Sequence, residues 1–237
     1  MTEFSGQALT CIRRQSVVFE KLSFALRGGQ MLALTGPNGS GKTSLLRLMA
    51  GLLEPAEGAL YWDGEEAEAA HLQEKIHWVA PVSPLKPQLT VLENLRFWAA
   101  INKTNGFVYS SAEEAKKPMA FSRAGAPDDG ERVLAALDRL GIARLAETRA
   151  QYLSAGQLRR AVLCRLFLAQ RPLWLLDEPA TSLDMETAKK LTGLVREHAE
   201  AGGIAVVATH RPEFWGADAE INMNSPLPSG RGLGEGD

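Results

Sequence analysis

Residues 31–50 read MLALTGPNGSGKTSLLRLMA, and this run organises the rest of the chain. Its first part, Met31–Thr35, is an apolar run of the kind that forms a buried parallel strand. The next eight residues, Gly36–Thr43, match the pattern G-x-x-x-x-G-K-S/T. A helix is predicted from Ser44 to Ala50, with Gly51 just beyond its end. The sequence thus predicts a strand, a glycine-rich loop and a helix in direct succession.

The residue types in this loop suit the binding of phosphate oxygens. Glycines let backbone N–H groups turn inward around an anion, where a Cβ would obstruct them. The helix start adds partial positive charge, Lys42 adds a full charge, and the Thr43 hydroxyl can ligate Mg²⁺. A glycine-rich turn with a chance Lys-Thr pair is the alternative, and the flanking strand and helix argue against it. We therefore predict a nucleotide site made of Gly36, Pro37, Asn38, Gly39, Ser40, Gly41, Lys42, Thr43 and Ser44.

Length and composition restrict the class of protein. The chain has 237 residues, enough for one large core or for one core with a subdomain. A net charge of −2 gives no reason to expect nucleic-acid binding. Cys11 and Cys164 are far apart, so a reducing compartment is expected rather than a disulfide framework. Without a signal peptide or an apolar run of about 20 residues, the chain is expected in the cytosol or on the cytosolic face of a membrane.

Strands alternate with helices along the chain, which predicts a mostly parallel sheet covered on both faces. Residues 8–35 are expected to contain antiparallel strands that lead into the loop. We expect one domain over residues 1–222, with a helical subdomain at about 88–165. Further strands are expected at 58–62, 76–80, 173–176 and 204–209, and helices at 90–100, 131–140, 158–169 and 185–201.

Thr90-Val91-Leu92-Glu93 has the sequence of a capping box at the start of the first of these helices. Ser154 is the expected N-cap of the third. One apolar face of the second helix is expected from Val133, Leu134, Leu137 and Leu140.

Two segments have the composition of loops. Residues 102–130 combine prolines, glycines, serines and mixed charge, which predicts an exposed loop or a partly disordered insert. We expect this insert to be dispensable for nucleotide binding, because long surface insertions cost little closure entropy. Residues 223–237 have too little apolar content to fold alone, and a disordered tail is expected there.

Polar residues follow two of the apolar strands immediately. In parallel sheets, ligands collect at the carboxyl ends of strands. Asp177 suits a Mg²⁺ ligand paired with the Thr43 hydroxyl, and Glu178 could polarise an attacking water. His210 follows the last of these strands. A solvated turn is the alternative for an Asp-Glu pair, and the phosphate loop upstream favours a functional site.

A second anion-binding element is predicted at Ser154-Ala155-Gly156-Gln157, where a serine and a glycine precede a helix. Two phosphate-binding elements in one chain suggest a two-fold dimer, in which each subunit's second element covers the other subunit's nucleotide.

Five motifs together resemble the ATPase subunits of ABC transporters. Their order and spacing are those of that family's Walker A loop, signature (here LSAGQ), Walker B strand, D-loop and switch histidine, at Gly36–Thr43, Leu153–Gln157, Leu173–Glu178, Ser182–Asp184 and His210. The resemblance covers about residues 8–215, apart from the insert. It implies an α/β P-loop NTPase fold of the ABC ATPase type, with an antiparallel β subdomain and an α-helical subdomain.

The resemblance also implies ligands and roles. ATP and Mg²⁺ are the expected ligands, with Lys42 on the β- and γ-phosphates and Thr43 and Asp177 on Mg²⁺. Glu178 would act on the attacking water, and His210 would contact the γ-phosphate. In an ATP-dependent dimer, Ser154, Gly156 and Gln157 would reach the partner's nucleotide, with Asp184 at that interface. Integral membrane subunits would be the partners, with the chain peripheral on the cytoplasmic face of the inner membrane.

Within the family, the chain resembles the ATP-binding subunits of the haem exporters of cytochrome c maturation. The similarity lies in LSAGQLRRAVLCRLFLAQRPLWLLDEP, in GGIAVVATHRP and in a short C-terminus. No direct haem binding is expected, because no C-x-x-C-H motif occurs and His71, His77 and His198 are interpreted as surface or core residues. Another ABC transporter's subunit, a soluble ABC ATPase, and a slowly hydrolysing ATP-gated regulatory module remain as alternatives.

Two positions depart from the family pattern. The aromatic residue that stacks on adenine in the family falls here near Arg13-Arg14, so a guanidinium would have to stack instead. The glutamine of the family's Q-loop falls near Pro81-Val82, and the neighbouring Gln73 and Gln88 are displaced by several residues. Slow hydrolysis or altered coupling to the membrane subunits is the expected consequence.

Overall fold

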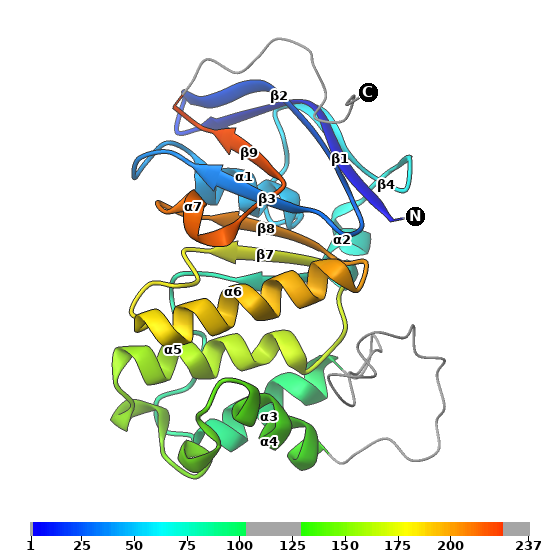
Figure 1. The fold of residues 1–237 in the computed structure, drawn as a ribbon. Helices are drawn as coiled ribbons and strands as arrows, with labels where there is room; N and C mark the ends of the chain where they lie inside the picture. Colours follow the sequence, from blue (N-terminus) through cyan, green and yellow to red (C-terminus); the bar gives the residue numbers. More distant parts are fainter. Residues whose placement is uncertain (1, 103–128, 225–237) are drawn as a thin grey trace. The chain divides into compact units, whose positions relative to one another are not determined.

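The computed structural model describes residues 2–102 and 129–224, and these divide into two units (Figure 1). The first unit comprises Met1–Trp78, Pro172–Glu178 and Val195–Asp237, and the second comprises Val79–Arg171 and Pro179–Leu194, each within its described residues. The predicted insert at 102–130, apart from its end residues, lies outside the described residues. So does the tail from 225 onward, and both remain predictions.

The first unit contains a five-stranded sheet with the order β6-β7-β8-β3-β9. Strand β3 pairs in parallel with β8 and β9, and β7 pairs in parallel with β8. Every residue of β3, β7 and β8 is buried, which explains their unbroken apolar sequences. The predicted parallel core is confirmed, and β9 was not predicted. The strand bounds are Ile76–Val79 for β6, Leu173–Asp177 for β7, Ile204–Ala208 for β8, Met31–Thr35 for β3 and Ala219–Asn222 for β9.

The same unit contains an antiparallel sheet with the order β2-β1-β4-β5. Strands β1 and β2 form a hairpin whose turn residues, Arg14 and Gln15, both have positive φ angles of 47° and 65°. This is a tight two-residue hairpin turn without the Asn-Gly sequence that usually signals it. The expectation of antiparallel strands within 8–35 holds for the hairpin, and Met31–Thr35 belongs to the parallel sheet. The bounds are Glu3–Arg13 for β1, Ser16–Arg27 for β2, Glu57–Trp62 for β4 and Glu65–Glu66 for β5.

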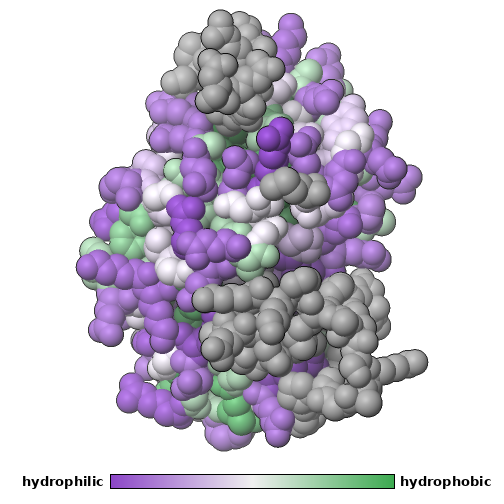
Figure 2. Space-filling view, turned by 45° about the vertical axis from the view of Figure 1, so that its right-hand side comes forward, coloured by the Kyte–Doolittle hydropathy of each residue, from purple (hydrophilic) through white to green (hydrophobic). Residues whose placement is uncertain are grey.

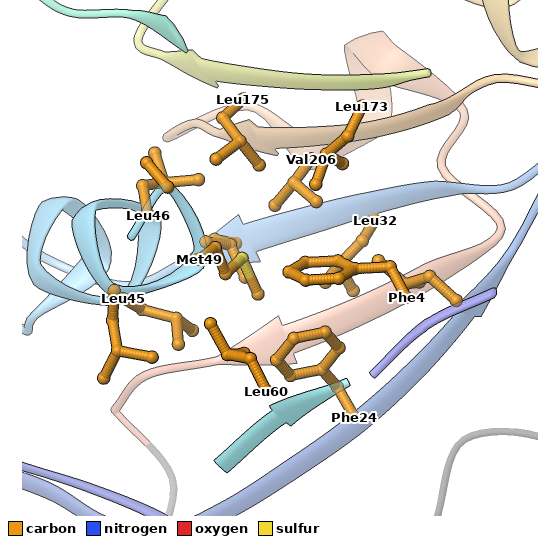
Figure 3. Close-up of a cluster of buried hydrophobic side chains, with 14 of the residues drawn as sticks. Phe4, Phe24, Leu32, Leu45, Leu46, Met49, Leu60, Leu173, Leu175 and Val206 are labelled. Carbon is orange, nitrogen blue, oxygen red and sulfur yellow. The ribbon is translucent and has the colours of Figure 1, made fainter. Parts of the chain in front are cut away.

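Helix α1 (Lys42–Met49) packs its apolar face into the core between these strands (Figure 3). The core contains the α1 residues Leu45, Leu46 and Met49, the strand residues Leu32, Leu173, Leu175 and Val206, and from the antiparallel sheet Phe4, Phe24 and Leu60. Gly51 follows with φ 64°, and the Leu52 N–H donates to the Arg47 carbonyl at 2.9 Å, so the predicted glycine stop is confirmed. Burial of this face fixes the start of α1, and hence the phosphate loop, at the end of β3.

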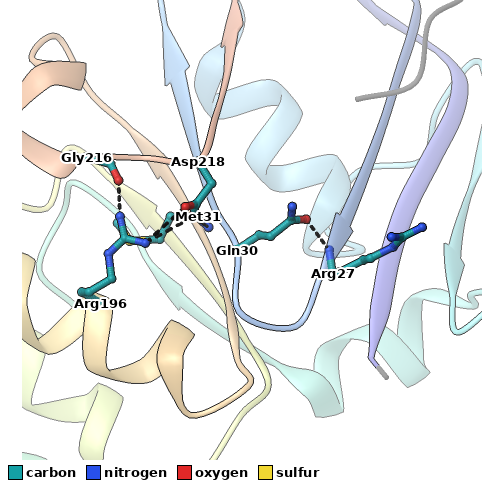
Figure 4. Close-up of polar contacts among 6 residues, drawn as sticks. All are labelled: Arg27, Gln30, Met31, Arg196, Gly216 and Asp218. Carbon is teal, nitrogen blue, oxygen red and sulfur yellow. Dashed lines mark hydrogen bonds and ion pairs between the residues drawn. The ribbon is translucent and has the colours of Figure 1, made fainter. Parts of the chain in front are cut away.

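Polar contacts hold β9 beside β3 (Figure 4). The Met31 N–H donates to Asp218 Oδ2 at 2.7 Å. Arg196 forms an ion pair with the same carboxylate, 3.3 Å from Nη1 to Oδ2, and also donates to the Gly216 carbonyl. The backbone donor at the start of β3 is therefore satisfied by a side chain just before β9. Two short helices that were not predicted also belong to this unit, α2 (Ala69–Lys75) and α7 (Pro212–Trp215).

The second unit is helical. The capping box at Thr90 is confirmed, because the Glu93 N–H donates to Thr90 Oγ1 at 3.1 Å and the Thr90 N–H donates to Glu93 Oε2 at 2.7 Å. The helices are α3 (Val91–Asn102), α4 (Asp129–Arg139) and α5 (Ala155–Leu163), with 3₁₀ turns at Ala143–Leu145, Ala150–Tyr152 and Cys164–Phe167. Helix α6 (Met185–Glu200) starts here and ends in the first unit.

Three helix predictions need correction. Helix α5 begins at Ala155 rather than Leu158, because Ser154 caps it there, and its predicted end is a 3₁₀ turn. Helix α4 begins two residues before the predicted Glu131. Leu134 was assigned to the apolar face of α4 but is 44% exposed, whereas Val133 and Leu137 are fully buried.

His198 is a buried histidine in the core of the first unit. Its imidazole stacks on the Trp174 indole, with ring centroids 4.0 Å apart and planes 5° from parallel. Gly203 covers it so closely that a Cβ there would clash with the ring. Burial lowers the pKa of His198 to about 4, so the ring is neutral at neutral pH. This agrees with the interpretation of His198 as a core residue.

We predict that His198 makes the protein acid-sensitive. The unfolded chain protonates this histidine near pH 6.5, whereas the folded chain does so only near pH 4. Between these values protons bind preferentially to the unfolded state, so His198 removes up to about 3 kcal/mol of stability as the pH falls. His198→Phe keeps the stacking and is expected to flatten this part of the profile. Urea unfolding from pH 7.5 to 4.5 measures it, with His71→Phe at an exposed position as the control. Equal slopes for His198→Phe and wild type would contradict the prediction.

Candidate nucleotide site

The register of the parallel sheet brings three strand ends together. Leu34 and Asp177 both pair with Ala208, so β3, β8 and β7 end level with one another. The backbone continues this alignment, since the Glu178 N–H donates to the Ala208 carbonyl and the Thr209 N–H donates to the Leu34 carbonyl, both at 3.0 Å. The phosphate loop, Asp177, Glu178 and His210 therefore gather at one edge of the sheet, as the sequence predicts.

The phosphate loop is shaped by close packing at two glycines. A Cβ on Gly36 would lie 2.8 Å from Ser40 Oγ, and one on Gly41 would lie 2.7 Å from Val18 Cγ1. Both residues also have positive φ angles, 129° and 104°, so a side chain at either position would be strained. The Ser40 hydroxyl is buried and has no hydrogen-bond partner among the described residues. Such an orphaned donor is expected where a ligand oxygen completes the site.

The start of α1 supplies the positive end of this site. Gly41 is its N-cap and provides no side-chain cap, so the first N–H groups of α1 lack an intrahelical partner. Lys42 is only 7% exposed, and its Nζ donates to the Gly36 and Pro37 carbonyls at 2.6 and 3.0 Å. Uncapped donors, a buried ammonium group and the Ser40 hydroxyl fit the phosphate chain of a nucleotide.

Thr43 and Asp177 make a direct side-chain contact. The Thr43 hydroxyl donates to Asp177 Oδ2 at 2.7 Å, and Asp177 is 2% exposed. A hydroxyl and a carboxylate are two of the oxygen ligands that Mg²⁺ accepts, the others being water and phosphate oxygens. Among the described residues, no group of three or more His, Cys, Asp or Glu side chains could hold a metal ion by itself. A metal at this position would depend on oxygens of a bound nucleotide.

Glu178 and His210 face each other next to this pair. His210 Nε2 lies 3.0 Å from Glu178 Oε1 and 3.1 Å from Asn38 Oδ1 in the phosphate loop. Glu178 has a φ of 47°, a conformation that costs a residue with a side chain of the order of 1–3 kcal/mol. The His210 imidazole orients the Glu178 carboxylate, and this carboxylate, next to Asp177, can act on a water molecule.

A model of the family described as ABC transporter matches residues 19–181, more than half of the chain. The chain belongs to the ABC transporter family.

Two relatives with high sequence identity to this chain share the same name. The "cytochrome c biogenesis ATP-binding export protein CcmA" of Paramagnetospirillum magneticum is 45% identical over 223 residues, which cover 93% of this chain and 89% of the relative. The protein of the same name from Rhodopseudomonas palustris is 41% identical, with 88% of this chain and 92% of the relative covered.

Solved structures share the fold at lower identity. An ABC transporter ATP-binding protein from Pyrococcus furiosus is 21% identical with a TM-score of 0.73, covering 93% of this chain and 97% of its own. A dimeric ATP-binding cassette in a post-hydrolysis state, bound to ADP and Pi, is 24% identical with a TM-score of 0.75, covering 92% of this chain and 93% of its own. The α/β fold of an ABC ATPase is therefore shown.

The residues predicted to form the family's signature lie in the second unit. Ser154 caps α5, with its Oγ accepting from the Gln157 N–H at 3.3 Å and its own N–H donating to Gln157 Oε1 at 2.9 Å. A Cβ on Gly156 would lie 2.7 Å from the Ser182 carbonyl oxygen, so the signature packs tightly on the D-loop. Asp184 accepts from the Thr187 N–H and hydroxyl at the start of α6, and these hydrogen bonds lower its pKa.

The two departures from the family pattern are visible in the structure. Arg13 is exposed at the end of β1, beside the hairpin turn. Val82 is 79% exposed, and Gln73 donates through Nε2 to the Gly51 carbonyl at 3.2 Å. Gln73 is therefore engaged elsewhere. Of the two nearby glutamines, Gln88 is the one that could take the role of the Q-loop glutamine, and it is exposed in the same connecting segment as Val82. Sequence reasoning missed Arg159, a buried arginine in α5, because its neighbour Arg160 is the same residue type and no pattern marks Arg159 as the buried one.

We predict that a glutamine restored at position 82 speeds hydrolysis. Positioning of water supplies much of the catalysis in phosphoryl transfer, whereas nucleotide affinity depends on the phosphate loop and Lys42. Val82→Gln, or Pro81→Gln if the register differs by one, is expected to raise turnover several-fold at unchanged ATP affinity. Val82→Met, similar in length but without an amide, is the control.

The same assay includes Gln88→Ala, with phosphate release and nucleotide affinity measured for every variant. A collapse of turnover in Gln88→Ala, without a gain in either glutamine variant, would show that Gln88 already fills the role.

Proposed function

We propose that this ABC ATPase powers an export complex of cytochrome c biogenesis, dimerising around two Mg-ATP and driving integral membrane subunits. The observation that carries the ATPase function is the meeting of Thr43, Asp177, Glu178 and His210 at the ends of β3, β7 and β8. The export role is supported by relatives up to 45% identical over most of the chain, whose name includes that process.

In the proposed mechanism, each side chain acts where the geometry allows. Lys42 and the N–H groups at the start of α1 hold the β- and γ-phosphates. Thr43 and Asp177 would hold Mg²⁺, which would neutralise charge on the phosphates. Glu178 orients and polarises the attacking water, and His210, 3.0 Å from the Glu178 carboxylate, contacts the γ-phosphate.

The signature residues are proposed to act across the dimer. Ser154, Gly156 and Gln157 lie at the N-terminus of α5. The capping box pairs the N–H groups of Ser154 and Gln157, and the N–H groups between them, which have no intrahelical acceptor, are proposed to reach a partner's nucleotide. Asp184 would lie at the same interface. The dimeric cassette of similar fold, with ADP and Pi bound, supports this arrangement. Arg13, exposed at the end of β1, is proposed to stack on the adenine base.

The proposed cargo is haem, and the proposed location is the cytoplasmic face of the inner membrane. Among the described residues, no helix is long and apolar enough to cross a bilayer, so membrane subunits would supply the path. On the face drawn in Figure 2, hydrophilic residues surround small hydrophobic patches. His77 and His198 are buried, and no haem or nucleic acid is expected to bind this chain directly.

A second function, a slowly hydrolysing ATP-gated module, is favoured by one observation. Val82, which is 79% exposed, stands where the family resemblance predicts a glutamine. Such a module would dimerise on ATP with very slow turnover. Turnover of the purified protein at saturating Mg-ATP separates the two functions, and copurification with membrane subunits tests the export role.

We predict that Glu178→Gln binds Mg-ATP, forms a stable dimer and hardly turns over. Loss of a positioned base costs about 10²–10⁴ in rate, whereas the phosphate loop is untouched. Phosphate release measures the rate, and light scattering with ATP measures the dimer. Glu213→Gln, an exposed carboxylate in α7, is the control and should behave as wild type. Wild-type hydrolysis by Glu178→Gln would exclude Glu178 as the catalytic carboxylate.

A further inference from the structure

Arg159 is a buried arginine in α5 that holds two distant loops at once. It is 7% exposed. Its Nε donates to the Pro179 carbonyl at 3.1 Å, and its Nη1 donates to the Ala80 carbonyl at 2.8 Å. The three residues belong to the same unit, although 79 and 20 positions separate Arg159 from the two acceptors. One planar guanidinium thus fixes the backbone of two segments relative to the signature helix.

The two carbonyls stand at informative positions. Pro179 is bonded directly to Glu178, the proposed catalytic carboxylate. Ala80 comes immediately before Pro81-Val82, where the family's water-orienting glutamine is replaced. Burial of a guanidinium costs free energy unless the group is well hydrogen-bonded, so Arg159 requires acceptors at this position. Its fork geometry suits two acceptors in fixed directions, which a lysine cannot match.

A second contact ties the same helix to the same loop. Gly156, one turn before Arg159, packs on the Ser182 carbonyl with no room for a Cβ. Ser182 itself has a φ of 67°, so the segment from Pro179 to Ser182 is held in a constrained conformation. The first two turns of α5 therefore contact both ends of the segment Pro179–Ser182, which follows Glu178.

We infer that Arg159 is a positioning residue that couples the signature helix to the backbone beside Glu178 and before Val82 in the same subunit. Movement of α5, when its N-terminus engages a partner's nucleotide, is transmitted through Arg159 to Pro179 and so to the neighbouring Glu178. This inference rests on the proposed ATPase function.

The test removes the fork while keeping the volume. Arg159→Met cannot donate to either carbonyl, and Arg159→Lys keeps the charge but not the two fixed directions. We expect kcat to fall about 10- to 100-fold in Arg159→Met, because small misplacements of catalytic groups have effects of this size. Arg159→Lys should lie between Arg159→Met and wild type. KM and the affinity for ATP of the single subunit should be unchanged. Arg144→Met, at an exposed position of the same unit, is the control.

Two readouts distinguish positioning from a merely structural role. In the Glu178→Gln background, Arg159→Met should still form the ATP-dependent dimer, because it affects the backbone beside Glu178 rather than the phosphate contacts of Ser154. Hydrogen exchange should speed up at the backbone amides of Ala80, Val82, Ser83 and Ala180–Leu183, and should not change within α5. Loss of the dimer, or exchange that rises throughout the second unit, would overturn the inference in favour of a structural role.

The remaining outcomes are equally decisive. Wild-type kcat in Arg159→Met would overturn the inference while leaving the ATPase function intact. If Arg159→Met does not fold, Arg159→Lys carries the test, and wild-type kcat in that variant overturns the inference. A wild-type protein that does not hydrolyse Mg-ATP would instead contradict the proposed function.

Discussion

The pairing of β3, β8 and β7 is the constraint on which the candidate site depends. Leu34 and Asp177 are both in register with Ala208, and each strand leads directly into a polar segment. A slip of one residue in β7 would turn Asp177 to the opposite face of the sheet and away from Thr43. Packing of particular side chains opposes such a slip, because Trp174 of β7 would lose its stacking on His198. The core of the first unit therefore positions the site residues by fixing the register of β3, β8 and β7.

Each ionisable side chain at the strand ends contacts a polar partner. The Lys42 ammonium group lies against loop carbonyls, and the Thr43 hydroxyl lies against the Asp177 carboxylate. His210 bridges the Glu178 carboxylate and Asn38. Lys42 and Asp177 are both buried, and their hydrogen bonds limit the cost of desolvating their charges.

Much of this arrangement could be predicted from the sequence, because continuous apolar strands followed at once by Gly36, Asp177 or His210 carry both the fold and the site. Strand β9 was missed, since Ala219–Asn222 is a short edge strand placed by Asp218 and Arg196 rather than by its own pattern. Leu134 was misassigned because it lies about 100° around α4 from Val133, outside the buried face that Val133 and Leu137 share. Arg159 was missed because its role depends on hydrogen bonds to two backbone carbonyls that are distant in the sequence and come close only in the folded chain.

The most direct test of the account is the Mg²⁺-dependent part of the stabilisation by ATP, measured by thermal unfolding with ATP and either Mg²⁺ or EDTA. In the Glu178→Gln background, Thr43→Val, Asp177→Asn and the double variant are compared, with Thr192→Val in α6 as the control. If one ion requires both side chains, each single variant loses most of the Mg²⁺ contribution and the double variant loses little more. A full Mg²⁺ contribution in either single variant, or losses that simply add, would contradict a single site built from the ends of β3 and β7.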